Sequence, residues 1–170
     1  ELDRVVPVVE ALAQYPVVLS IDTSQPEVMR AAVQAGAHIW NDVRALTRPH
    51  ALQTAAALNI PVIIMHMRGE PTTMNSLAQY EDVTEDVLQE LQQRINAALA
   101  AGILPHNIMI DPGFGFAKDA EHNFKLLNEL YRLNALGYPM LSGLSRKRFI
   151  GEALGGVEPT QRAVGSVAGH

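Results

Sequence analysis

The 170-residue sequence predicts an α/β fold, a partial (β/α)8 barrel with about five parallel strands and their helices. Short apolar runs alternate with helical patterns along the chain, which is typical of parallel strands joined by right-handed crossovers. Every predicted strand ends in residues suited to binding. This favours a barrel over the alternative, an open doubly wound sheet, because an open sheet concentrates its chemistry at one switch point.

Five mainly apolar runs are predicted to be strands. They comprise residues 17–21, 37–40, 62–67, 108–110 and 139–143. Each run is short, and polar or turn-forming residues follow it, as expected for parallel strands covered on both faces. No phosphate-binding glycine fingerprint lies between any of these runs and the helix that follows.

Helical patterns precede and separate the strands. They cover residues 1–12, 24–36, 51–58 and 82–102, a stretch around Phe124 that ends at Gly137, and residues 145–154, and a small-residue helix begins near residue 160. Ser24 and Glu27 have the spacing of a capping box, and Asp82 with Glu85 can cap the long fourth helix. The inward faces are predicted from apolar stripes, which are Val87, Leu88, Leu91, Ile95 and Leu99 in the fourth helix and Phe124, Leu127, Leu130 and Leu133 in the fifth.

Composition narrows the classes of partner. With 48% hydrophobic residues the chain can bury a real core, and we expect a single domain over residues 1–170. A net charge of −5, with acids and bases interspersed, argues against nucleic acid and anionic membranes as partners. The absence of cysteine excludes disulfides and thiolate metal sites, which fits a reducing compartment.

The stretch from Ile108 to Lys118 contains the most informative acidic residue. Asp111 ends an apolar run, and a proline and two glycines then turn the backbone. Because no basic residue stands beside it before Lys118, a charged, half-buried Asp111 should accept N–H groups of a ligand. The alternative is turn chemistry, in which the carboxylate bonds its own backbone.

The other strand ends supply further polar groups. If the C-terminal ends of the strands surround one opening of the barrel, two carboxylates, an amide and an ammonium face a common pocket. These groups suit a planar heterocycle with several N–H donors and a carbonyl. Apolar side chains supply its faces. The polar candidates are Asp22, Asn41, Asp111 and Lys147, and the apolar ones are Met65 and Phe116.

Structural roles are the alternatives for these residues. Asp22 could cap a helix, Asn41 and Asp42 could form a turn, and Lys147 could be a solvated lysine in the first turn of a helix, although a cation there opposes the helix dipole. His66 alternates with its methionine neighbours, so we expect a buried, hydrogen-bonded histidine that points away from the pocket. Lys118 is expected to matter little.

Five motifs, in order, resemble those of the dihydropteroate synthase family of pterin-binding TIM barrels. They are Ser20-Ile21-Asp22-Thr23, Asn41-Asp42-Val43, Met65-His66-Met67, Asp111-Pro112-Gly113-Phe114-Gly115-Phe116 and Gly143-Leu144-Ser145-Arg146-Lys147. The resemblance covers the whole chain. It implies a cytoplasmic, usually homodimeric enzyme of folate biosynthesis that joins 6-hydroxymethyl-7,8-dihydropterin diphosphate to p-aminobenzoate, releases diphosphate and is the target of sulfonamides.

Site residues follow from the same resemblance. Asp22, Asn41, Asp111 and Lys147 would hold the pterin, with Asp111 and Lys147 also catalytic. The slot for the ring would be shaped by Met65, Phe116 and Gly143. No metal ligand is expected among these residues, although the family resemblance implies Mg²⁺ at the diphosphate.

The departures from the family pattern lead to an expectation about completeness. The chain begins at Glu1 within a helical pattern and stops within one at His170. We expect a domain truncated at both ends, without the first two strands and the last strand of the family, and therefore inactive by itself. The alternatives to a synthase are a pterin-binding methyltransferase barrel, which lacks the Ser-Arg-Lys element, and a catalytically inactive pterin-binding fragment.

Overall fold

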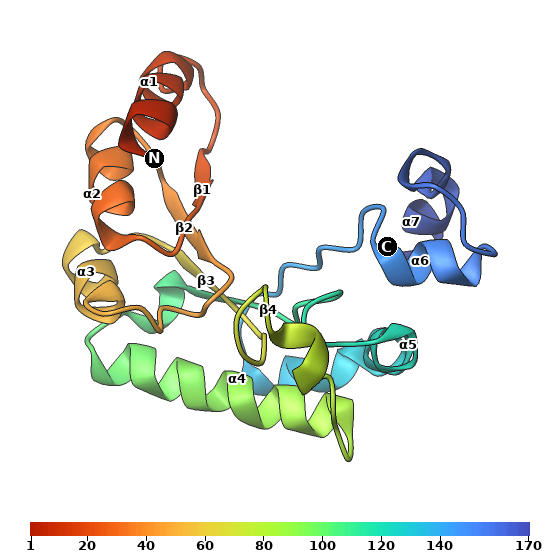
Figure 1. The fold of residues 1–170 in the computed structure, drawn as a ribbon. Helices are drawn as coiled ribbons and strands as arrows, with labels where there is room; N and C mark the ends of the chain where they lie inside the picture. Colours follow the sequence, from red (N-terminus) through yellow and green to blue (C-terminus); the bar gives the residue numbers. More distant parts are fainter. The chain divides into compact units, whose positions relative to one another are not determined.

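The computed structural model describes residues 1–170 and contains one four-stranded sheet (Figure 1). The strands lie in chain order, β1 (Ser20–Asp22), β2 (Ile39–Asp42), β3 (Val62–Met65) and β4 (Ile108–Asp111). β1 pairs with β2, and β2 with β3, in parallel registers. The helices between them are α2 (Pro26–Gln34), α3 (Ala51–Leu58) and α4 (Val83–Ala100). The predicted α/β alternation is confirmed.

The chain divides into two compact units. The first comprises residues 1–65 and 91–110, and the second comprises residues 66–90 and 111–170. Each unit has its own buried side chains.

The core of the first unit forms around Trp40 of β2. This side chain is fully buried, and its Nε1 donates to the Thr23 carbonyl oxygen over 2.7 Å. Helix α1 (Leu2–Leu12) precedes β1, and the 3-10 helix η2 (Pro105–Asn107) precedes β4. Gly36 follows α2 with φ +113°, and a Cβ there would lie 2.6 Å from Ala13 Cβ. Glycine therefore allows the turn after α2 to pass close to the end of α1.

The start of α2 differs from the prediction. Its N-cap is Gln25, whose side chain makes no capping hydrogen bond, so the capping box from Ser24 to Glu27 is wrong. The Ser24 hydroxyl donates instead to the Asp42 carboxylate. A buried carboxylate is a stronger acceptor than the neutral groups of a helix end, and it takes the hydroxyl that the cap would have used.

The second unit packs around Phe114. Helix α5 (Ala120–Asn128) begins at a capping box made by Asp119 and His122. The later elements of this unit are η3 (Leu130–Leu136), α6 (Arg148–Ala153), η4 (Pro159–Gln161) and α7 (Ala163–Gly169), and η1 (Met74–Leu77) lies in its earlier segment. Phe114 is fully buried, and its ring lies 6.1 Å from that of Phe149.

The fifth helix is shorter than predicted. It ends at Asn128, and the following residues form the 3-10 helix η3. Phe124 is 40% exposed and not inward, because α5 turns Asn123 and Leu126 to the interior. The polar Asn123 is satisfied there, since its Oδ1 accepts from Gly115 N over 2.7 Å.

The predicted fifth strand, residues 139–143, is wrong. Only Met140 forms a bridge, and the segment otherwise has no strand pairing. Pro139 has no N–H to give a neighbouring strand, Leu141 is 39% exposed, and a glycine at 143 weakens a strand further. The first strand is also shorter than predicted, because it begins at Ser20 and leaves Val18 70% exposed.

Candidate functional site

Asp22 and Asn41 lie side by side in the first unit, at the ends of β1 and β2. They are register partners, and the Asn41 side chain hydrogen-bonds the Asp22 carboxyl. Burial raises the pKa of Asp22, and the negative charge of Asp42 raises it further. Asn41 Oδ1 is buried and has no hydrogen-bond partner. A buried oxygen without a hydrogen bond destabilises the protein unless a donor reaches it. The Asn41 amide oxygen is therefore suited to accept an N–H group of a ligand.

Asp42 points to the interior and has a structural role. Asn41 and Asp42 end β2 and do not form a turn themselves, but the Asp42 carboxylate bonds the turn that follows. Asp42 is fully buried, and its carboxylate accepts from Arg44 N and Leu46 N, each over 2.9 Å, besides the Ser24 hydroxyl. The register of β2 thus directs Asn41 and Asp42 to opposite faces, as the alternation of a strand requires.

We expect Asp42→Ala to lower the free energy of unfolding by about 3–5 kcal/mol, because three donors lose a buried carboxylate. Urea unfolding followed by the fluorescence of Trp40 measures this. The matched control is Asp3→Ala in the exposed first turn of α1, where the cost should stay below about 1 kcal/mol. Equal losses in the two variants would contradict the structural role of Asp42.

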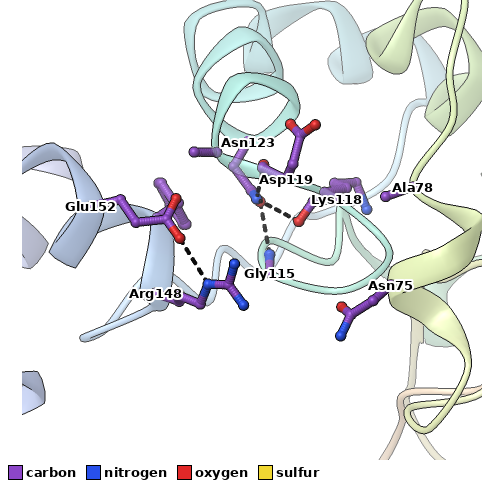
Figure 2. Close-up of a pocket in the computed structure, with 10 residues that line it drawn as sticks. Asn75, Ala78, Gly115, Lys118, Asp119, Asn123, Arg148 and Glu152 are labelled. Carbon is purple, nitrogen blue, oxygen red and sulfur yellow. Dashed lines mark hydrogen bonds and ion pairs between the residues drawn. The ribbon is translucent and has the colours of Figure 1, made fainter. Parts of the chain in front are cut away.

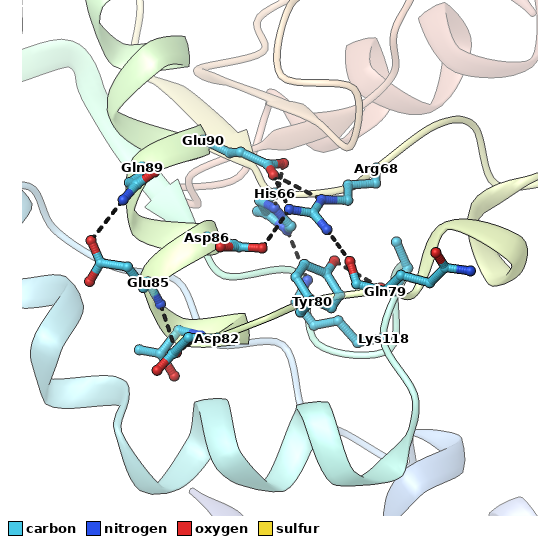
Figure 3. A network of polar contacts seen from close by, with 12 residues as sticks. His66, Arg68, Gln79, Tyr80, Asp82, Glu85, Asp86, Gln89, Glu90 and Lys118 are labelled. Atoms are coloured by element: carbon cyan, nitrogen blue, oxygen red, sulfur yellow. Dashed lines mark hydrogen bonds and ion pairs between the residues drawn. The ribbon is translucent and has the colours of Figure 1, made fainter.

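His66 is buried, as predicted, and its two ring nitrogens are occupied (Figure 3). Nε2 lies 3.0 Å from Glu90 Oε2, and Nδ1 lies 2.9 Å from Lys118 Nζ. Burial, with help from the Lys118 charge, lowers the pKa of His66 to about 4, so the ring is neutral at pH 7. The prediction of a satisfied core histidine is confirmed. Its neighbour Met65, the last residue of β3, is 4% exposed.

Asp111 shows the turn chemistry that was one of its two interpretations, and its role toward a ligand stays a prediction. Its carboxylate accepts from Gly113 N over 2.7 Å, which is turn chemistry, and its carbonyl oxygen accepts from His66 N over 2.9 Å. Two lysines lie near this carboxylate in space, although none stands beside it in the sequence before Lys118. The residue is 8% exposed, and its charge acts on Lys118 and Lys147, both in its own unit.

Lys147 contacts the loop that follows Asp111, residues 113–118. Its side chain is partly buried, so it is not a solvated surface lysine. Its Nζ donates to the Phe114 carbonyl oxygen and stands 4.5 Å from the centroid of the Phe116 ring. Burial lowers the pKa of Lys147, opposed by attraction to Asp111. Gly115, at φ +77°, makes room for it, because a Cβ there would lie 2.9 Å from Lys147 Cδ. The second unit thus brings three predicted residues together, namely Asp111, Phe116 and Lys147.

Two predicted features of the site remain without direct support from the geometry. Gly143 lies in the irregular segment before α6, and a Cβ there would meet open space, so its role in a ring slot stays a prediction. No group of three or more His, Asp or Glu side chains could hold a metal ion. The Mg²⁺ that the family resemblance implies at the diphosphate stays a prediction. No helix has both the length and the apolarity that a membrane crossing needs.

A polar cavity of about 250 Å³ adjoins the loop of residues 113–118, which follows Asp111 in the second unit (Figure 2). Its lining residues include Asn75 from η1, Gly115 and Lys118 from the loop, and Arg148 from α6, whose Nε donates to Glu152 over 2.8 Å. None of the seven predicted site residues lines this cavity. The cavity thus lies next to the loop that carries Phe116, but the predicted residues do not form its walls.

Lys118 is the functional candidate that the sequence missed. It was expected to matter little, yet it is 8% exposed and bonded to His66 and to two loop carbonyls. Nothing in the local sequence distinguishes it from Lys125, which is 40% exposed at its side chain and pairs with Asp82. Only the fold of the loop shows that Lys118 turns inward.

Comparison with known proteins agrees with the motifs. The chain matches the family described as pterin binding enzyme over residues 1–170. It is 49% identical to dihydropteroate synthase of Haemophilus influenzae, over 99% of this chain and 62% of that protein. It therefore spans about three fifths of the length of such relatives.

Solved structures of relatives align with almost the whole of this chain, as two of them illustrate. Dihydropteroate synthase from Xanthomonas albilineans, in complex with 7,8-dihydropteroate, aligns with a TM-score of 0.93 at 51% identity, over 100% of this chain and 62% of that one. The Yersinia pestis enzyme, in a complex with a sulfonamide drug, aligns with a TM-score of 0.95 at 47% identity, over 99% and 61%. The predicted partial barrel is thus confirmed. This chain belongs to the pterin-binding enzyme family, and its relatives in that family are dihydropteroate synthases.

Proposed function

We propose that this chain is the pterin-binding portion of a dihydropteroate synthase, which condenses 6-hydroxymethyl-7,8-dihydropterin diphosphate with p-aminobenzoate to give 7,8-dihydropteroate and diphosphate. The observation that carries the proposal is the buried, unpartnered Asn41 Oδ1 beside the Asp22 carboxyl. An amide oxygen and a carboxyl group at adjacent strand ends can accept the neighbouring N–H groups of a pterin ring.

The family resemblance also assigns pterin-binding roles to groups of the second unit. The Asp111 carboxylate can accept paired N–H donors, and the Lys147 ammonium can donate to a ring nitrogen or carbonyl. Phe116 and Met65 offer apolar surface to the faces of the ring. Lys147 also favours the synthase over the methyltransferase alternative, because the Ser-Arg-Lys element that carries it is absent from that class.

The proposed reaction is a substitution at the methylene carbon of the dihydropterin. The C–O bond to diphosphate breaks, and the leaving group takes the electron pair. The amine nitrogen of p-aminobenzoate forms the new C–N bond and loses a proton. Positive character that develops on the methylene spreads into the ring, where Asp22 and Asp111 can stabilise it. Lys147 orients the ring for this attack.

The test is a turnover assay on the protein expressed from its complete reading frame, with both substrates and Mg²⁺ present. We expect 7,8-dihydropteroate, identified by its mass, and inhibition by a sulfonamide that competes with p-aminobenzoate, as the sulfonamide complex of the Yersinia pestis relative suggests. Methyl transfer from a folate, or binding of the dihydropterin without any product, would contradict the proposal in favour of one of the alternatives.

Location and assembly are part of the same proposal. The absence of cysteine supports a reducing compartment, and we infer a cytoplasmic enzyme. The family resemblance further supports a homodimer, which the molar mass from light scattering on the purified protein would test.

A further inference from the structure

Lys118 is a buried lysine that has no role in the proposed reaction. Its Nζ lies 2.9 Å from His66 Nδ1, 3.1 Å from the Gly113 carbonyl oxygen and 3.1 Å from the Phe116 carbonyl oxygen. An ammonium has three N–H donors, and here it meets three acceptors. Two of these belong to the loop of residues 113–118, and the third belongs to the residue that follows β3.

The third acceptor is available because of the hydrogen bond on the other side of the His66 ring. Nε2–H donates to Glu90, which leaves the Nδ1 lone pair for Lys118. Burial raises the pKa of Glu90, but hydrogen bonds from His66 and Arg68 outweigh it and lower that pKa to about 2. Glu90 is therefore an anion, and it fixes the tautomer of His66 (Figure 3).

The loop itself needs such an anchor. Ala117 has φ +49°, a left-handed conformation that a residue with a Cβ adopts at a cost of about 1 kcal/mol or more. The Tyr80 hydroxyl donates to the Ala117 carbonyl oxygen over 2.8 Å. The guanidinium carbon of Arg68 lies 4.0 Å from the centroid of the Tyr80 ring. Tyr80 at the Ala117 carbonyl and His66 at the Lys118 side chain thus restrain the end of this loop.

We propose that Lys118 is a positioning residue for dihydropterin binding, which fastens the loop of residues 113–118 to His66. The Asp111 carboxylate, bonded to Gly113 N, and the Phe116 ring then keep the places that the ligand requires. Lys118 acts through Asp111 and Phe116 and does not touch the ligand. The inference rests on the proposed function, because it names the same site and the same ligand.

The charge of Lys118 gives a second, independent signature. Burial lowers its pKa to about 7, opposed by Asp111 and Glu90 and assisted by Lys147 and Arg68. The titratable or charged groups around it are His66, Arg68, Glu90, Asp111 and Lys147, with Tyr80 over the same loop. Between pH 7 and the ordinary 10.5 the unfolded chain binds more protons at this residue than the folded protein. The free energy of unfolding should therefore rise with pH across this window, and Lys118→Met should remove that component.

The experiment compares Lys118→Met, Lys118→Arg and the matched control Lys125→Met in the protein expressed from its complete reading frame. Calorimetry with 6-hydroxymethyl-7,8-dihydropterin diphosphate gives the dissociation constant and, separately, the fraction of protein that binds. We expect Lys118→Met to raise Kd by about tenfold or more, because the loop loses three hydrogen bonds to a cation. Lys118→Arg keeps the charge but is too large for the same three acceptors, so it should bind severalfold more weakly than wild type. Lys125→Met should bind like wild type.

The two readouts separate positioning from simple stabilisation. A residue that only stabilised the fold would lower the binding fraction and leave Kd unchanged. An unchanged Kd in Lys118→Met would overturn the inference, and if that variant does not fold, an unchanged Kd in Lys118→Arg would do so. Wild-type protein that fails to bind the dihydropterin would overturn the proposed function together with this inference. Wild-type protein that binds, with variants that bind equally well, would overturn the inference alone.

Discussion

Asp111→Asn is expected to weaken dihydropterin binding by well over an order of magnitude. The substitution keeps an oxygen that can accept from Gly113 N, so the turn survives. It replaces the other carboxylate oxygen by an NH₂ group, which would oppose an N–H donor of the ring. Loss of a buried charged contact of this kind typically costs about 2–5 kcal/mol.

Calorimetry on the protein from the complete reading frame measures this loss. Asp3→Asn, at an exposed position of α1, serves as the control and should bind like wild type. Near-native affinity in Asp111→Asn would remove Asp111 from the ligand site, and the turn interpretation would then describe all that this carboxylate does.

Lys147→Ala is expected to reduce both turnover and dihydropterin affinity by about tenfold or more, while the melting temperature changes little. The ammonium donates to a loop carbonyl and stands over Phe116, so its loss removes a donor from the site and leaves the buried core intact. Lys125→Ala, in the middle of α5, is the matched control. Lys118→Ala is unsuitable as a control, because Lys118 is buried and bonded to the same loop.

Steady-state kinetics and thermal melting on the two variants decide the role of Lys147. Equal kinetics in Lys147→Ala and Lys125→Ala would place Lys147 outside the site. A large fall in melting temperature, with unchanged kinetic constants for the folded enzyme, would assign it to stability instead.

The parts of the fold that were predictable depend on local signals. Helix α3 has the predicted bounds, and Asp82 caps α4 as predicted by accepting from Thr84 N and Glu85 N over 3.0 and 3.1 Å. Val87, Leu91 and Ile95 of the predicted α4 stripe are fully buried, but Leu99 near the end of the helix is 36% exposed, so the inward face is shorter than predicted. A periodic stripe or a capping side chain within a few residues decides such features, so the sequence contains what is needed to predict them.

The predictions that were wrong depend on interactions between residues that lie far apart in the sequence. Ser24 bonds a carboxylate 18 residues away, and no local pattern reveals that competition. Residues 139–143 have the apolar character of a strand, but a strand needs partners, and the segment around Met140 has a single bridge. The interior position of Lys118 depends on His66, 52 residues away. The candidate residues Asp22, Asn41 and Asp111 were predicted because each follows an apolar run, whereas Lys118 lies in a loop and has no such local signal.

A crystal structure of the protein from its complete reading frame with bound 6-hydroxymethyl-7,8-dihydropterin would test the central claim most directly. We expect the Asp111 carboxylate to accept paired N–H groups of the ring, Asn41 Oδ1 to gain its missing donor, and Lys147 to donate to the ring. A dihydropterin bound elsewhere, such as in the cavity lined by Asn75 and Arg148, with no ring contact to these three side chains, would contradict it.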